Sequence, residues 1–173
     1  MSPRIRLACL PLLLMSAAGA DAVTRTWPGP APCNATLQAC IDASAAADTV
    51  LVASSASVAA STLFVNKPLV LRAAPGHRPR IDAGAAIAGS VNVAGNWTWQ
   101  VEGFDLAQGF IQLNVQGGDA ATVVIRDNRI AQELSGAAEI SLLKTGTNTT
   151  TLDYEISRNV LNYFWDTFDG SLR

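Results

Sequence analysis

Residues 48–82 have the sequence DTVLVASSASVAASTLFVNKPLVLRAAPGHRPRID. Three short runs within this stretch are apolar and rich in β-branched residues, as strands are: Val50–Val52, Leu63–Val65 and Leu69–Leu71. The segments between them are short and consist mainly of small residues, so no amphipathic helix separates one run from the next, as an α/β sheet would require. Short strands joined by short turns predict a chain that coils around an axis.

The order of residues in this stretch also resembles a known family. Asp48-Thr-Val-x-Val is followed by Leu63-x-Val-x-Lys-Pro-Leu-x-Leu-Arg and then by Pro75-Gly-x-x-Pro-x-Ile-Asp. This pattern resembles the first coils of right-handed parallel β-helix proteins of the pectate-lyase-like superfamily. The resemblance implies an all-β, right-handed parallel β-helix. It implies no particular activity, because this fold carries lyases, hydrolases and adhesins.

The N-terminus has the composition of a secretory signal peptide. Two arginines precede an apolar run over residues 7–15, and the small residues at 18–22 offer cleavage sites. We expect cleavage after Ala22, with Ala20 as the second choice, and an uncleaved anchor as the alternative. The apolar run is too short to span a membrane. The sequence therefore predicts a signal peptide over 1–22 and a chain that is secreted, periplasmic or displayed at the cell surface.

Composition excludes several classes of function. The chain has 12 Lys and Arg against 14 Asp and Glu and contains no basic run, which argues against nucleic-acid binding. Its single histidine, His77, lies in a Pro-Gly turn, which argues against a histidine-rich metal site and a Ser-His-Asp triad. We expect no cofactor, except calcium if the protein is a lyase.

Residues 23–35 form a proline-rich lead-in, and residues 36–47 have the alanine content and apolar spacing of a helix. In the family that the chain resembles, a short helix at this place closes the N-terminal end of the coil. Export makes a disulfide between Cys33 and Cys40 plausible. Seven residues of continuous helix rise about 10.5 Å, so this bridge requires Cys33 to lie outside the helix and fold back on it.

Three similar units predict the repeat of a solenoid over residues 36–173. They begin at Val101, Ile125 and Ile156, at intervals of 24 and 31 residues. Their alignment places Asn128 over Asn159, which predicts a ladder of stacked amides at a turn where asparagine tolerates the left-handed conformation. We expect about four to six coils. Further strand candidates lie at residues 90–94, 110–115, 139–143 and 152–156. An antiparallel sandwich is the alternative architecture.

Candidate binding residues fall in two places. Trp97 and Trp99 lie two apart and share one face of a strand. They form a platform for sugar rings if they face outward and core if they face inward, and the neighbouring Val101 favours the core. Arg126 and Asp127 belong to the densest charged group in the chain. This group is a candidate glycan contact, but its spacing favours a solvated face.

Arg72, His77, Arg78 and Arg80 surround a Pro-Gly loop that could contact an acidic polysaccharide, but a solvated turn is the favoured interpretation. A calcium site would need Asp127 together with Glu102 or Asp105 from one coil and Glu155 from the next. The sequence shows no convergent acid and base. We therefore expect an exported scaffold or surface protein that binds glycans without chemistry, and the alternative is a polysaccharide lyase or hydrolase.

The last repeat is followed by a cluster of aromatic residues at 163–168. These side chains either fold over the open end of the coil as a plug or begin a further coil. We favour the second interpretation, in which the chain is the N-terminal part of a longer β-helix. It predicts self-association through the C-terminal edge.

Overall fold

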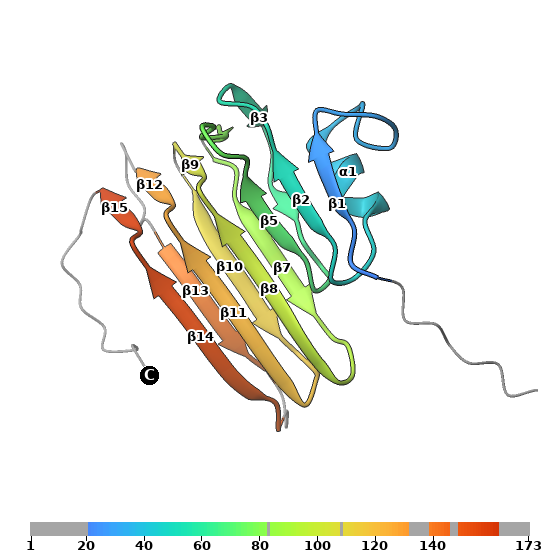
Figure 1. Cartoon of the computed structure of the whole chain (residues 1–173). Coiled ribbons are helices and arrows are strands. Elements are labelled where there is room, and N and C mark those ends of the chain that lie inside the picture. The colour runs from blue at the N-terminus through green and yellow to red at the C-terminus, as the bar shows by residue number, and fades with distance from the viewer. Residues whose placement is uncertain (1–20, 83, 108, 132–138, 146–148, 163–173) are drawn as a thin grey trace, which may run out of the picture.

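The computed structural model describes residues 21–82, 84–107, 109–131, 139–145 and 149–162. Over these residues the chain forms a parallel β-solenoid, in which successive coils stack along one axis as three sheets (Figure 1). All neighbouring strands in these sheets run parallel to one another. The predicted parallel β-helix is therefore confirmed, and the antiparallel sandwich is wrong.

Each complete coil contributes one strand to each sheet. Sheet A consists of β1 (Thr24–Trp27), β2 (Thr49–Val52), β5 (Val70–Ala73), β8 (Asn96–Glu102), β11 (Ala120–Arg126) and β14 (Thr151–Ser157). Sheet B consists of β3 (Ser57–Ala59), β6 (Arg80–Ile81), β9 (Asp105–Leu106), β12 (Arg129–Ala131) and β15 (Val160–Asn162). Sheet C consists of β4 (Leu63–Phe64), β7 (Ile87–Val91), β10 (Phe110–Val115) and β13 (Glu139–Lys144). The described chain thus makes about four turns, at the lower end of the expected range.

The register of the strands reproduces the repeat alignment made from the sequence. Ile125 pairs with Val101 on one side and with Ile156 on the other. At the next corner, Ile130 of β12 pairs with Leu106 of β9. Because register decides which side chains face inward, this agreement means that the three units fill equivalent places in the core.

The core lies in the lumen between the three sheets. Side chains alternate along the strands of sheet A, so that Val101 and Ile125 point inward and are fully buried, whereas their neighbours point outward. Full burial of such a side chain stabilises the fold by about 1.5–3 kcal/mol. Stacking of like residues in successive coils makes this apolar column continuous, and it supplies the main driving force for coiling.

Three strands were not expected from the sequence: β1 in the lead-in, and the short strands β3 and β6. β6 has only two residues. β3 follows a serine-rich segment and itself lacks the composition that is usual for a strand. Their strand conformation comes from pairing with neighbouring coils, which overrides local propensity. The strand expected at 90–94 lies earlier, over β7, whereas β10 has the expected bounds.

The N-terminal helix is shorter than the sequence predicted. α1 spans Leu37–Ala43, and the Thr36 hydroxyl caps it by accepting a hydrogen bond from the Ala39 N–H at 3.1 Å. The helix stops because the next N–H groups have other partners. Ser44 N–H donates to the Ile41 carbonyl, and Ala45 N–H donates to the Asp48 carboxylate at 2.9 Å.

Asp48 also fastens β1 to the first coil. Its carboxylate is 2% exposed and accepts the Val23 N–H at 2.8 Å and the Arg25 Nε at 3.4 Å. Burial opposes the charged form, but the hydrogen bonds from the two backbone N–H groups and from Arg25 together lower the pKa of Asp48. The carboxylate therefore stays charged and holds the lead-in strand beside β2.

Cys33 and Cys40 are bonded as a disulfide, with their Cα atoms 4.4 Å apart. Cys33 lies outside α1 and folds back on it, as the geometry of the bridge required. Leu37, Cys40 and Ile41 are fully buried and cover the first coil. The helix thus closes the N-terminal end of the lumen.

Two side chains bind the helix to the coil beneath it. The Gln38 amide accepts the Phe64 N–H at 2.8 Å and donates to the Phe64 carbonyl at 3.0 Å, which satisfies the exposed edge of β4. The Lys67 ammonium donates to the carbonyls of Ile41, Asp42 and Ser44 at 3.2, 2.9 and 2.8 Å. These contacts satisfy the C-terminal carbonyls and place a cation at the negative end of the helix dipole.

The other end of the solenoid is less covered. Tyr154 and Ile156 of β14 occupy inward positions of the repeat but are 53% and 43% exposed. Among the described residues, no strand pairs with β14 on its outer side. Self-association through this edge stays a prediction. The aromatic cluster at 163–168 and residues 1–20 of the predicted signal peptide lie outside the described residues. The helical part of the described chain offers no segment that is long and apolar enough to cross a membrane.

Candidate functional site

The corner between sheets A and B positions the candidate site. At this corner Gly103, Asp127 and Arg158 occupy the same place in successive coils and have φ values of 84°, 57° and 53°. The left-handed residue thus precedes the asparagine in each of the last two coils. The expectation that Asn128 and Asn159 themselves adopt this conformation is wrong, because the turn is made by the residue before them.

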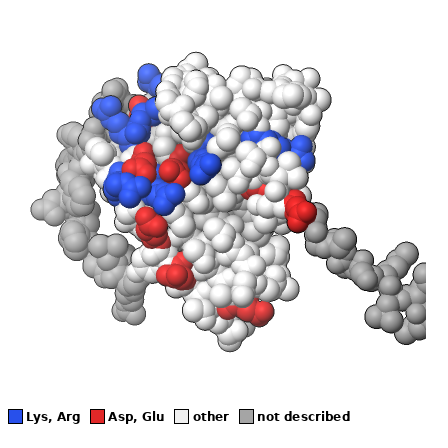
Figure 2. All heavy atoms as spheres, in the orientation of Figure 1, with Lys and Arg blue, Asp and Glu red and all other residues white. Residues whose placement is uncertain are grey.

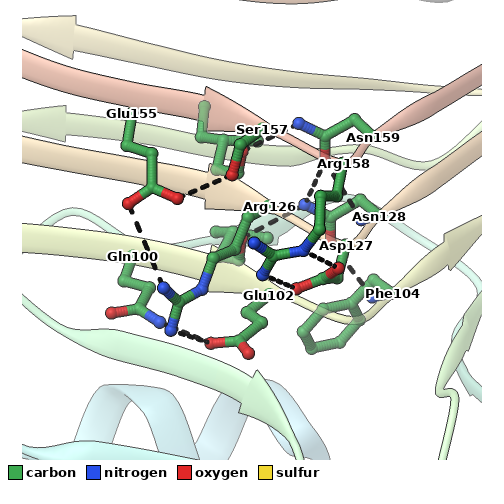
Figure 3. A network of polar contacts seen from close by, with 12 residues as sticks. Gln100, Glu102, Phe104, Arg126, Asp127, Asn128, Glu155, Ser157, Arg158 and Asn159 are labelled. Atoms are coloured by element: carbon green, nitrogen blue, oxygen red, sulfur yellow. Dashed lines mark hydrogen bonds and ion pairs between the residues drawn. The ribbon is translucent and has the colours of Figure 1, made fainter.

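The two asparagines do form the expected ladder. The Asn128 side chain is buried, accepts the Phe104 N–H at 3.0 Å, and donates to the Val101 carbonyl at 3.1 Å. Its Nδ2 and its backbone N–H both donate to Oδ1 of Asn159, at 3.1 and 3.0 Å (Figure 3). The ladder therefore supplies hydrogen bonds that the backbone lacks at the corner, and its role is structural.

Outside the ladder, sheet A carries a network of charged side chains. Arg126 lies between Glu102 and Glu155, with N–O distances of 3.1 and 4.0 Å (Figure 3). Gln100 donates to the same Glu102 carboxylate at 2.6 Å. Glu102 and Arg126 stand in register, as expected from the sequence. The two acidic groups therefore pair with Arg126 and not with Asp127.

Asp127 is engaged by Arg158 from the next coil. The guanidinium donates through Nε and a terminal nitrogen to the two carboxylate oxygens, at 2.7 and 2.6 Å. This hydrogen-bonded contact is the main cause that holds the pKa of Asp127 below its usual value, and it raises the pKa of Arg158. A carboxylate with a lowered pKa and both oxygens occupied is poorly suited to act as a general acid or base.

Sheet B extends this charged surface with arginines that lack an acidic partner. Arg80 and Arg129 pair in register with Asp105, one on each side. Both are exposed, and within the described chain neither forms an ion pair within 4.0 Å. Together with Asp105 they line a depression of about 230 Å³. Arg72 is exposed and stands in register with Glu102, so it adds a third such group on sheet A.

Figure 2 shows basic and acidic side chains gathered on one part of the molecular face, over the corner of sheets A and B. Much of the rest of that face is white. The sequence alone did not single out Arg80, Asp105 and Arg129 as a group. Its repeat alignment already placed Asp105 and Arg129 at one position, but Arg80 lies in a coil without the repeat pattern, so only the structure brings the three together.

The structure places Trp97 and Trp99 in the lumen. They are 7% and 0% exposed, and their indole N–H groups donate to the carbonyls of Gly117 and Val65, both at 3.0 Å. Of the two interpretations made from the sequence, the core interpretation agrees with this burial. Both residues alternate with outward-facing neighbours along β8, so they lie on the opposite side of sheet A from Arg126.

In the described part of the chain, no group of three or more His, Cys, Asp or Glu side chains is arranged to hold a metal ion. No family model, curated protein or solved structure matches the chain. The resemblance to the pectate-lyase-like superfamily therefore rests on the sequence pattern alone, and what the structure adds is a parallel β-solenoid with an arginine-rich corner.

Proposed function

We propose that this protein is an exported scaffold that binds an acidic polysaccharide through the corner of sheets A and B. The observation that carries the proposal is a pair of exposed arginines, Arg80 and Arg129, that line a depression and form no ion pair with any other described residue. Planar guanidinium groups bind carboxylates through two parallel hydrogen bonds. Export is supported by the signal-like N-terminus and agrees with the disulfide between Cys33 and Cys40.

The solenoid suits a polymeric ligand. Arg80, Asp105 and Arg129 lie on adjacent coils, and neighbouring strands are about 4.8 Å apart. The two arginines therefore stand about 10 Å apart along the axis, and a polymer with regularly spaced carboxylates can contact both. The chain has a net charge of −2, so attraction of an acidic polymer depends on this local excess of arginine.

The test is a titration of the protein with polygalacturonate, followed by calorimetry at low and at high salt. We expect binding that weakens with salt, and a loss of about tenfold or more in affinity for the double variant Arg80→Gln/Arg129→Gln, because each substitution removes a charge-assisted contact. Lys144→Gln, which removes a cation from sheet C, is the matched control and should bind like the parent protein.

Equal affinity of the double variant and the parent would refute the proposal. The same samples, incubated with and without calcium, distinguish the alternative of a lyase or hydrolase. A lyase would form unsaturated products, and a hydrolase would form new reducing ends. If either product appears with the parent protein and is lost in Asp127→Asn, the alternative is established. We expect neither product, since Asp127 is held by Arg158.

A further inference from the structure

Sheet A contains an interrupted strand pairing. β8 pairs with β11 over its full length of seven residues, but with β5 only from Gln100 to Glu102. The pairing with β5 ends near Pro68, which precedes that strand. The Pro68 carbonyl accepts a hydrogen bond from the Ala47 N–H at 2.8 Å, so the chain at this point pairs with residue 47 and not with β8. The N-terminal half of β8 thus extends past β5, as Figure 1 shows at the lower end of the sheet.

This half of β8 presents unpaired backbone groups. The Gln100 N–H donates to the Leu69 carbonyl. The even-numbered residues of β8 therefore direct their backbone N–H and C=O groups toward the side on which β5 lies. Asn96 and Thr98 therefore direct their N–H and C=O groups to the side where no strand lies. Among the described residues, no backbone partner is found for these groups. Both residues are exposed, so these groups are accessible from solvent.

The unpaired edge opens into a notch of about 690 Å³. Residues of β8 line its middle, residues 46–47 and Pro68 and Val70 line one side, and Ala120 and Thr122 of β11 line the other. The β8 segment contributes Asn96, Trp97 and Thr98. None of the described residues that line the notch is charged. Its volume falls in the range of about 300–1,000 Å³ that is usual for ligand sites.

We propose that this notch binds an extended, uncharged peptide segment, which adds to sheet A as a short strand beside β8. An extended peptide presents a backbone donor and acceptor on one edge at every second residue, about 6.6 Å apart. The unpaired groups of Asn96 and Thr98 have the same spacing, so the two edges can form hydrogen bonds with each other. The uncharged, small-residue walls favour apolar or hydroxyl side chains and disfavour charged ones. The occupant is a segment of about three to five residues, and the site is separate from the arginine-rich corner.

The test measures amide hydrogen exchange of the full chain by NMR, with an acetylated and amidated Thr-Val-Thr-Val-Thr peptide as the probe. In the protein alone, the Thr98 amide should exchange quickly for a strand residue. At saturating peptide, we expect its exchange to slow by about tenfold or more, because the N–H gains a partner. A peptide of the same sequence with N-methylated valines lacks donors on one edge and should protect Thr98 less.

Two proline variants test the edge without any ligand. Thr98→Pro removes an N–H that has no partner, so its melting temperature should stay within about 3 °C of the parent. The matched variant is Thr122→Pro on β11. The Arg126 carbonyl of that strand accepts a hydrogen bond from the Gly103 N–H, so the even-numbered residues of β11 direct their backbone groups toward β8. The N–H of Thr122 therefore belongs to the ladder between β8 and β11. Its removal should lower the melting temperature by about 5 °C or more.

Thr98→Pro should also abolish protection by the peptide at the neighbouring Asn96 amide. Slow exchange of Thr98 in the absence of peptide, equal protection by both peptides, or no protection by either would overturn the proposal. Protection by a neutral oligosaccharide in place of the peptide would overturn it as well. None of these outcomes bears on the binding of polygalacturonate, which involves a different surface.

Discussion

Asn128→Ala should destabilise the protein by about 3 kcal/mol or more. The substitution removes the acceptor of the Phe104 N–H, for which the described residues show no other partner. It also removes a donor to the Val101 carbonyl in the same buried corner. Each buried polar group left without a partner costs about 1–3 kcal/mol. The measurement is the free energy of unfolding from urea titration, with circular dichroism at about 218 nm as the signal for strand content.

Asn114→Ala is the matched control for this variant. Asn114 is half-buried on sheet C, and its side chain accepts a hydrogen bond from the Thr145 hydroxyl at 2.9 Å. We expect a change of about 0.5 kcal/mol or less, as is usual for surface sites. If Asn128→Ala and Asn114→Ala unfold at the same urea concentration, the amide ladder does not hold the corner together.

Trp99→Ala should destabilise the protein by about 3–5 kcal/mol, the range measured for removal of a large aromatic side chain from a core. Trp99 is fully buried, and its indole N–H donates to the Val65 carbonyl of another coil. Gly89 stands beside it, and a Cβ at that position would meet the same carbonyl at 2.6 Å. The ring thus fills a space with little freedom to collapse, and the cavity persists in the variant.

Trp99→Phe separates the two contributions of the indole, because it keeps most of the apolar volume and loses the hydrogen bond. We expect it to be intermediate between the parent and Trp99→Ala in the same urea titration. A loss below about 1 kcal/mol for Trp99→Ala would be typical of a surface residue and would contradict the placement of this ring in the lumen.

The sequence predicted the fold because a solenoid repeats its local pattern. The units that begin at Val101, Ile125 and Ile156 align residue by residue, so their register and their buried positions followed directly. The first coils were harder to predict in detail. β3 and β6 are short and lack a strand composition, and they are extended only because neighbouring coils pair with them.

The candidate site was predicted only in part. Arg126 and Asp127 are recognisable in the sequence as its densest charged group. Arg126 points outward in the alternation along β11, whereas Asp127 follows the strand as the left-handed residue of the corner. The repeat alignment also gave the register of Glu102 with Arg126. The ion pairs of Arg126 with Glu155 and of Asp127 with Arg158 were not predicted, because they depend on the direction of the side chains. The notch beside β8 was not foreseen either, since it results from a difference in length between two strands that are distant in sequence.

The central functional claim is that the arginines beside Asp105 attract an acidic polymer. The most direct test is the affinity of Asp105→Asn for polygalacturonate, measured by calorimetry at low salt beside the parent protein. Asp105 lies between Arg80 and Arg129 in the register of sheet B, so removal of its negative charge should strengthen binding several-fold and steepen the salt dependence. Unchanged or weaker binding by Asp105→Asn would contradict the claim.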